Sequence, residues 1–546
     1  MFERMFANRK HLVRLKTLIF VLFFLAACRH GQSGHFYREP SAEEVKDMKS
    51  WNLDFFLDTE IKEKIDSSPS LGSDPVPSPY VPDGSSILDD DYLTLGIPVT
   101  FKSLRPFVRS EKEIESELSA VKEMPKRPPI IIIMSDTTRN DYITEKVAPH
   151  LSDFRKESWA PMTFSAGGVT ALSTFSLYHG ISPYWMVDRG RKQENLGSPY
   201  LKVAAKLGYK FKVFSKQEWY PCLDSNNPIT DTSDYWLPIL QLNYNMYESM
   251  VDQCHNNRGI GSSMYFKDGQ VFDVGLTDRK ILYDAFQEIK KDQASGNVQN
   301  IYFIHLQNVH GPFDFSATSD AYFKPTCFHC ESELSIEIGR NAYANAVRGL
   351  DLDFKIFIDK LKSIDLYDES IVVFTADHGK YLGYRKSREF GHWGLVVWET
   401  TNIPMFIKLS KNYPEKNMHA QTASLYDLYP SIFSSLAAET FSKKLLGQSI
   451  FSDEHTSSLV STQSNRNSYS TKLAFVSKNY RAYVTLNAEN PWDVSGFTID
   501  RFGTVKDGLI PEFDLKNGDK AKIQKKVLAK FKSEFGSLLD KMIVSK

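Results

Sequence analysis

The sequence has almost no net charge, few cysteines and, beyond its first 27 residues, no apolar run long enough to cross a membrane. Its 546 residues include 66 Lys+Arg and 67 Asp+Glu, a formal net charge of -1. This balance gives no overall electrostatic reason to expect a nucleic acid as partner. Five cysteines exclude a disulfide-dense scaffold. A hydrophobic fraction of 42% with so little net charge excludes a disordered chain.

The N-terminus has the pattern of an export signal. A basic segment precedes an unbroken apolar run over residues 18–27, which is too short to span a bilayer but suits a signal-peptide core. The run ends in Leu25-Ala26-Ala27-Cys28, which resembles a bacterial lipobox. We therefore predict a lipoprotein signal peptide over residues 1–27 and lipidation of Cys28. An uncleaved anchor and an ordinary signal peptide with an incidental cysteine are the alternatives.

Export would place the protein in the bacterial cell envelope, lipid-anchored at the outer membrane or the periplasmic face. In that oxidising compartment an even set of cysteines can form disulfides. The set is Cys222, Cys254, Cys327 and Cys330. Pairing 222 with 254 and 327 with 330 is the economical arrangement, but all three pairings remain open. The 327–330 pair could instead be half of a zinc site, although the sequence has no second CxxC.

The pattern of apolar and polar residues changes at two points in the chain. Residues 28–126 form an N-terminal extension and tether. Over residues 127–460, apolar β-branched runs alternate with helical patterns, which predicts an α/β fold with a doubly wound, mainly parallel sheet and helices on both faces. The runs are 130–134, 211–214, 301–304, 371–375 and 404–407, and the helical patterns 199–207, 278–291 and 341–364. Residues 461–546 predict a small C-terminal α+β subdomain with strands at 472–476, 480–486 and 497–499 and a basic amphipathic helix at 519–544.

Chemistry-bearing residues follow the predicted strands. In doubly wound sheets, sites form beyond the carboxyl ends of the strands. Carboxylates and imidazoles at those ends are ligands for a hard or borderline divalent cation. They are Asp136 after the first strand, Asp377 and His378 after the fourth, His310 beyond the third and His392 before the last. His305, inside the third segment, is predicted to be a core histidine, with a ligand role as the alternative, and His329 has no predicted role.

A hydroxyl nucleophile is predicted in a turn of small residues that leads into a helix near residue 170. Thr170 or Ser173 at such a helix start would face free backbone N–H groups and the positive end of the helix dipole. Coordination to a cation would lower the pKa of the hydroxyl and make it nucleophilic. The alternative is that Thr170 or Ser173 only caps the helix.

These segments, in this order, resemble the alkaline-phosphatase-like superfamily in its sulfatase-type branch, which includes phosphoethanolamine transferases and lipoteichoic-acid synthases. The resemblance covers roughly residues 128 to 440 and implies a metal-dependent enzyme of that fold. It is carried by D-T-T-R-N-D at 136–141, G-V-T-A-L-S at 168–173, H-G-P-F at 310–313, D-H-G at 377–379, W-E-T-T-N-I-P at 398–404 and Y-D-L-Y-P-S at 426–431.

The nucleophile motif separates the members of this branch. Sulfatases carry C/S-x-P-x-R, whose first residue becomes formylglycine, whereas residues 170–174 read T-A-L-S-T and lack the Cys, the Pro and the Arg. The segment is similar to the threonine nucleophile of the phosphoethanolamine and phosphoglycerol transferases. Asp136 is a departure, because those transferases commonly have Glu there. Because no membrane helix follows residue 27, a hydrolase or a soluble-donor enzyme is favoured over head-group transfer from lipid.

The resemblance implies a role for each site residue. Asp136, Thr170, Asp377 and His378 would hold one divalent metal, Zn²⁺ first, with Mn²⁺, Ca²⁺ or Mg²⁺ as alternatives. Thr170 would attack, and His310 and His392 would stabilise the anion or protonate the leaving group. Arg139 would bind the anion or form a structural salt bridge.

The partner implied is an anionic phosphoester or sulfoester, with envelope lipid or glycan among the candidates, together with the membrane through the lipid anchor. Two alternatives remain open. One is a sulfuric ester hydrolase without formylglycine, and the other is a degenerate, non-catalytic surface binding module.

Overall fold

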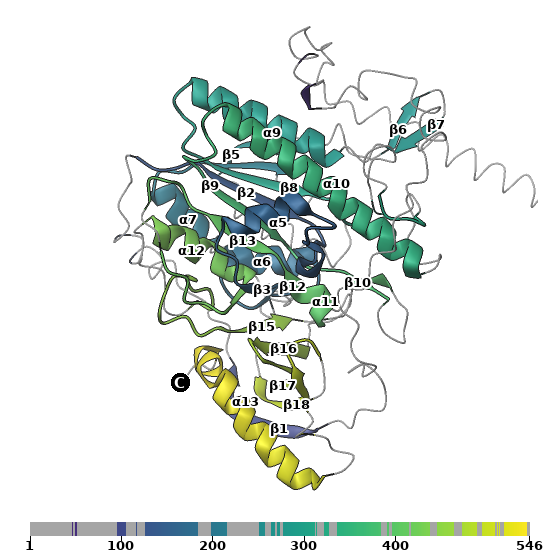
Figure 1. Ribbon diagram of the computed structural model, residues 1–546. Coiled ribbons are helices and arrows are strands. Elements are labelled where there is room, and N and C mark those ends of the chain that lie inside the picture. The colour runs from purple at the N-terminus through teal and green to yellow at the C-terminus, as the bar shows by residue number, and fades with distance from the viewer. Residues whose placement is uncertain are drawn as a thin grey trace, which may run out of the picture. The chain divides into compact units, whose positions relative to one another are not determined.

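The computed structural model describes the chain in segments. They are residues 46, 50–51, 95–104, 116, 119, 126–183, 198–215, 251–256, 264–267, 270–273, 277–311, 313, 322–326, 336–383, 390–392, 396–413, 416–436, 445–462, 472–488, 494–507, 510, 513 and 518–542. The chain divides into two compact units, residues 1–59 and 60–546. All elements named below belong to the second unit (Figure 1).

A six-stranded sheet forms the centre of this unit. Its strand order is β13-β9-β2-β8-β4-β5, and all neighbours are parallel except β13, which runs antiparallel to β9. Every residue of β2 is buried, as its β-branched sequence IIIIMS predicts for a central strand. The strands are β2 (Ile130–Ser135), β4 (Phe211–Ser215), β5 (Val251–Asn256), β8 (Ile301–Leu306), β9 (Ile371–Ala376) and β13 (Met405–Lys408).

Helices cover both faces of this sheet (Figure 1). On one face, alternate residues of β2 pack in a single apolar cluster with α6 (Thr170–His179), α7 (Pro199–Lys206) and α12 (Leu428–Ser435). On the other face, Phe354 contacts Phe374 of β9 and Phe154. Phe354 and Phe154 belong to α10 (Ile336–Ser363) and α5 (Pro149–Lys156), and α10 also packs on α9 (Thr277–Ala294). The predicted doubly wound α/β fold is therefore confirmed.

Several short elements complete this unit. A three-stranded sheet has the order β12-β3-β14, formed by β3 (Met162–Phe164), β12 (Asn402–Ile403) and β14 (Thr422–Ser424). A small hairpin joins β10 (Tyr381–Leu382) to β11 (Phe390–Gly391). The remaining short pieces are η2 (Asn140–Tyr142), α11 (Trp398–Thr401), η5 (Leu425–Asp427) and the hairpin of β6 (Met264–Lys267) with β7 (Gln270–Asp273).

A second, antiparallel sheet follows in the sequence. Its order is β1-β18-β17-β16-β15, and α13 (Lys520–Met542) packs its apolar stripe on this sheet in one hydrophobic cluster. Its edge strand β1 comes from the N-terminal extension, where no strand was predicted. The strands are β1 (Ile97–Leu104), β15 (Ser458–Thr462), β16 (Lys472–Ser477), β17 (Tyr480–Ala488) and β18 (Val494–Thr504).

Several sequence predictions fall where the structure gives no test. Cys28, Cys222, Cys327 and Cys330, with His329, lie outside the described residues, as does the predicted signal peptide. Cys254 lies in β5, whose side chains are not described. Within the described part of the chain, no helix combines the length and apolar character needed to cross a membrane.

Candidate metal and nucleophile site

Two adjacent parallel strands bring two carboxylates together. β2 and β9 pair in register up to Ser135 opposite Ala376, so the next residues, Asp136 and Asp377, leave the sheet side by side. Both are almost completely buried, with 1% and 0% of their surface exposed. Two carboxylates this deep in the protein need cations or hydrogen-bond donors to offset their lost hydration.

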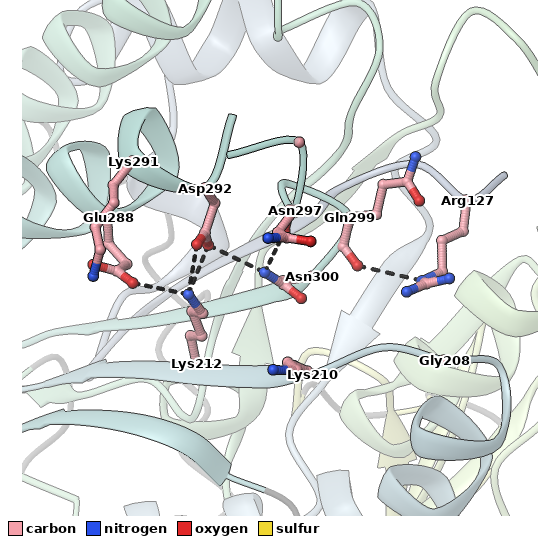
Figure 2. Close-up of a pocket in the computed structure, with 11 residues that line it drawn as sticks. Arg127, Gly208, Lys210, Lys212, Glu288, Lys291, Asp292, Asn297, Gln299 and Asn300 are labelled. Atoms are coloured by element: carbon pink, nitrogen blue, oxygen red, sulfur yellow. Dashed lines mark hydrogen bonds and ion pairs between the residues drawn. The ribbon is translucent and has the colours of Figure 1, made fainter. Parts of the chain in front are cut away.

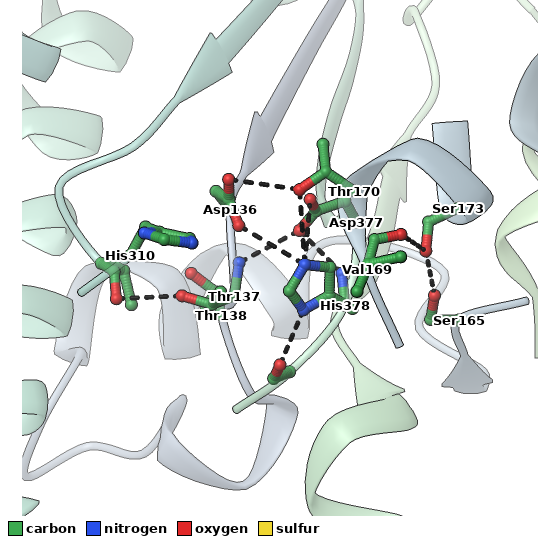
Figure 3. Close-up of polar contacts among 12 residues, drawn as sticks. Asp136, Thr137, Thr138, Ser165, Val169, Thr170, Ser173, His310, Asp377 and His378 are labelled. Atoms are coloured by element: carbon green, nitrogen blue, oxygen red, sulfur yellow. Dashed lines mark hydrogen bonds and ion pairs between the residues drawn. The ribbon is translucent and has the colours of Figure 1, made fainter. Parts of the chain in front are cut away.

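His378 faces both carboxylates. Its Nδ1 lies 2.8 Å from the Gly379 carbonyl oxygen. A carbonyl only accepts, so Nδ1 carries the proton of the neutral ring and Nε2 holds a lone pair. That Nε2 lies 3.7 Å from Asp136 Oδ1 and 3.5 Å from Asp377 Oδ2 (Figure 3). Fixing the tautomer through a backbone carbonyl is the usual arrangement for a metal-binding imidazole.

Thr170 completes the group. It is the first residue of α6, and its Oγ1 lies 3.4 Å from both Asp136 Oδ2 and His378 Nε2. The N-cap of α6 is Val169, and no side chain caps this helix end. The capping alternative therefore does not describe Thr170. Ser173 Oγ instead contacts Ser165 Oγ and the carbonyls of Gly167 and Val169, which makes it part of the scaffold of the turn.

The donor set fits a divalent cation. Asp377 Oδ2 accepts no hydrogen bond within the described residues, although it is fully buried. Ligand atoms of Asp136, Asp377 and His305 all lie within 4.8 Å of one another. Oxygen and nitrogen lone pairs that converge in a buried space repel one another unless a cation lies between them, and this composition suits Zn²⁺ and related ions.

His305 lies in this group rather than in the apolar core. It is fully buried on β8, paired with Met134 of β2. Burial lowers its pKa to about 4, which keeps the ring neutral, the form that binds metals. Burial raises the pKa of Asp377, but positive charge on the His378 and His305 rings, whenever they carry a second proton, and hydrogen bonds such as that from the Thr137 N–H lower it, and the net shift is below the ordinary value. Sequence periodicity could not separate this position from a packed core histidine.

Thr137 holds Asp377 in place through a strained backbone. Its φ is +57°, an outlying conformation for a β-branched residue. Its N–H donates to Asp377 Oδ1 at 3.0 Å and its hydroxyl donates to the Val309 carbonyl at 2.9 Å. Its own carbonyl accepts from the Tyr343 hydroxyl at 2.8 Å. The three hydrogen bonds compensate the strain and direct one peptide N–H at the carboxylate.

The other predicted site residues lie in two separate groups, the histidines beside His378 and Arg139 in an ion pair. The His392 ring centroid lies 4.6 Å from that of His378 and 5.5 Å from that of His310, so these three rings form one cluster. Arg139 is 1% exposed, forms an ion pair with Asp141 and donates to the Lys380 carbonyl. This is the salt-bridge alternative that the sequence left open.

The C-terminal sheet holds the turn before Thr170. Ser461 Oγ donates to the Ser165 carbonyl at 2.6 Å, and the Thr462 N–H donates to the Ala166 carbonyl at 2.7 Å. Buried Arg481 donates to the Val396 carbonyl at 2.8 Å and to Thr401 Oγ1 at 3.0 Å. The Thr401 carbonyl in turn accepts from the Ser165 N–H. No local sequence pattern reports these contacts, because they join residues that are 80 to 296 positions apart.

Comparison with known proteins agrees with this geometry. The profile of the family described as Sulfatase matches residues 128–437, more than half of the chain. A stretch of 144 residues is 26% identical to the low-salt glycan biosynthesis sulfotransferase Agl7 of Haloferax volcanii. This stretch is 26% of the chain and 34% of that protein, so the chain spans about a third of the length of this curated relative.

Solved structures share the fold. A provisionally assigned sulfatase, yidJ, from Bacteroides fragilis has a TM-score of 0.52 at 16% identity, over 77% of this chain and 97% of its own. The phosphonate monoester hydrolase SpPMH of Silicibacter pomeroyi has a TM-score of 0.52 at 14% identity, over 75% of this chain and 96% of its own. At these identities the similarity establishes the common fold alone.

Proposed function

We propose that this chain cleaves or transfers an anionic phosphoester through Thr170. The chain belongs to the sulfatase family and is a sulfatase-like enzyme of the alkaline-phosphatase-like superfamily. One observation carries the proposal. The Thr170 hydroxyl lies 3.4 Å from a buried carboxylate and 3.4 Å from a buried imidazole, at the start of α6. Residues 170–174 lack the pattern needed for formylglycine, so threonine itself is the nucleophile that the chain offers.

We further propose that Asp136, Asp377, His378 and Thr170 hold one divalent cation, Zn²⁺ first, with His305 as an additional donor beside them. When bound, such a cation acts as a Lewis acid and lowers the pKa of a coordinated hydroxyl. The protein prepares this by burying four of the donors, because Asp136, Asp377, His378 and His305 are each at most 1% exposed. Charges interact strongly in such surroundings.

Thr170, His310 and His392 have separate roles in the proposed two-step transfer. Thr170 gives its hydroxyl proton to a neighbouring acceptor, Asp136 Oδ2 at 3.4 Å, and its Oγ1 forms a bond to phosphorus while the bond from phosphorus to the ester oxygen breaks. His310 or His392 supplies the proton that the leaving oxygen needs, and the other stabilises the non-bridging oxygens. Water or an acceptor hydroxyl then displaces Thr170 from phosphorus and gives its proton to that histidine, while Thr170 Oγ1 regains the proton it had lost. The ring cluster of these histidines with His378 supports this assignment.

The substrate proposal is an anionic ester of the cell envelope, lipid or glycan, reached by an enzyme anchored through Cys28. The lipid anchor and the envelope location rest on the sequence pattern at residues 18–28. A sulfoester is the second candidate, because the family description and the named relatives include sulfate chemistry.

Kinetics of Thr170→Ala test the nucleophile. We expect wild type to turn over p-nitrophenyl phosphodiesters or the monoester, and the variant to lose at least roughly 10³-fold in kcat, because a nucleophile is not replaceable by its neighbours. Thr174→Ala is the matched control, since Thr174 lies one turn along α6 and its hydroxyl donates to the Thr170 carbonyl. The control should keep kcat within about threefold.

Two results would contradict this assignment. Turnover of p-nitrophenyl sulfate that survives Thr170→Ala would mean that another group attacks. A purified protein that contains no metal and is inert toward all three ester classes would favour the binding-module alternative.

A further inference from the structure

A polar cavity lies at the edge of the central sheet that is opposite to the group of Asp136 and Asp377. It has a volume of about 290 Å³ and opens where the strands begin, whereas Asp136 and Asp377 follow the strand ends. Lys210 and Lys212 lie at the start of β4, Asn300 immediately precedes β8, and Arg127 lies shortly before β2 (Figure 2). The cavity therefore shares no residue with the catalytic group.

The inner wall of the cavity is a closed network. Lys212 Nζ donates to Glu288 Oε1 at 2.8 Å and to both oxygens of Asp292 at 2.7 and 2.8 Å. Asp292 also accepts from Asn300 Nδ2 at 3.1 Å and from the Tyr302 hydroxyl at 2.6 Å. These side chains satisfy one another, so the inner wall is a rigid base rather than the part that contacts a ligand.

The outer wall presents a preformed guanidinium. Arg127 Nε donates to the Gln299 carbonyl at 3.3 Å, and its Cζ lies 5.4 Å from the centroid of the Tyr209 ring. Gly208 has φ +90°, and a Cβ there would lie 2.9 Å from Arg127 Nη1. A side chain at position 208 would therefore displace the guanidinium. The stacking, the hydrogen bond and the glycine together hold a planar fork of the kind that binds oxyanions.

The charge of the lining favours an anion. Among the residues that line the cavity, Arg127, Lys210, Lys212 and Lys291 are cationic and Glu288 and Asp292 are anionic, so the lining has a net charge of 4 − 2 = +2. Asn297 and Gln299 add amide groups, which both donate to and accept from hydroxyl groups. The volume lies near the lower end of the range for small-molecule sites.

We propose that this cavity binds a small phosphorylated or sulfated sugar, with Arg127 and Lys210 on the oxyanion and the amides on the hydroxyls. The site is separate from the catalytic group, so it would let the enzyme hold a second anionic group, such as one on a glycan chain or a released product. The proposal does not depend on which residue is the catalytic nucleophile.

Calorimetric titration tests the site directly. The host is full-length Thr170→Ala protein, so that the probe is not consumed, and the probe is glucose 6-phosphate at low salt, with glucose as the uncharged comparison. We expect Lys210→Gln and Arg127→Gln each to weaken binding of the phosphate by about tenfold or more. Lys206→Gln is the matched control, because Lys206 is an exposed lysine of the preceding helix and does not line the cavity.

His310→Ala in the same host separates the two sites. The proposal predicts that it leaves binding at the cavity unchanged. Loss of the heat with His310→Ala, together with full binding in Lys210→Gln, would assign the anion to the catalytic group and overturn the proposal. The absence of any heat with glucose 6-phosphate, or equal heat with glucose, would overturn it as well.

Discussion

Single residues at the site show what local sequence rules can and cannot predict. Asp136, Asp377 and His378 follow recognisable strands, so their convergence was predictable from the order of strand and polar residue. Thr137 was not predictable as a left-handed residue, because its β-branched side chain disfavours φ +57°. Only the hydrogen bonds to Asp377, Val309 and Tyr343, which lie far away in the sequence, make that conformation favourable.

Lys408 is a residue whose charge opposes folding. Burial lowers its pKa to about 8, although Asp368, Glu157 and Glu369 act in the opposite direction. Its Nζ donates to the carbonyls of Tyr367 and Ser370. Between pH 8 and the unfolded value of 10.5, the folded state releases this proton while the unfolded state still holds it. By linkage the free energy of unfolding must rise with pH in this window.

We therefore expect the Lys408 contribution to increase by roughly 1–2 kcal/mol from pH 8 to pH 10.5, after a discount for its partial exposure to solvent. Urea unfolding at several pH values measures it as the difference between wild type and Lys408→Met. Lys206→Met, an exposed lysine of α7, is the control and should give a difference that does not change with pH. A pH-independent difference for Lys408→Met would show that its pKa is not lowered.

At the scale of elements, five of the six strands of the central sheet were predicted, whereas β5 and two pairings were not. Runs such as Ile130–Ser135 and Ile371–Ala376 are so apolar that only a buried parallel strand suits them. β13 was predicted as a strand, but its antiparallel direction depends on the route of the chain through α11 and β12. The pairing of β1 with β18 joins residues about 400 apart, and no local pattern reports such a partner.

The contribution of strand β15 to positioning the turn before Thr170 can be measured. Ser461 Oγ donates to the Ser165 carbonyl in the turn that leads to Thr170. We expect Ser461→Ala to lower kcat by about tenfold with little change in KM, because the nucleophile loses alignment while the rest of the site stays intact. Stability should fall by about 1–2 kcal/mol, since the buried Ser165 carbonyl loses a donor.

Ser458→Ala is the control for this effect. Ser458 lies on the same strand and is almost buried, and its side chain makes no hydrogen bond within the described residues. It should leave both kcat and KM within about twofold. A fall in stability without a fall in kcat for Ser461→Ala would mean that β15 supports the fold and does not position the turn.

At the scale of the whole molecule, residues 60–546 form one compact unit in which two sheets serve one site. The central sheet supplies the carboxylates and imidazoles at its carboxyl edge, and the C-terminal sheet holds the turn before Thr170 through Ser461, Thr462 and Arg481. The division at residue 461 that the sequence suggested falls inside β15. A change in composition along the chain indicates a new type of secondary structure, but it does not show that the segments before and after it pack separately.

We propose that Thr170 carries the transferred group, and the intact mass of the protein tests this directly. The protein is incubated briefly with candidate phospholipids and phosphoesters, quenched with acid, weighed by mass spectrometry and then mapped by peptide. The account predicts a mass gain equal to the transferred group on the peptide that contains Thr170, and its absence in Thr170→Ala. A mass gain on any other residue, or steady turnover with no adduct on Thr170 under rapid quench, would contradict it.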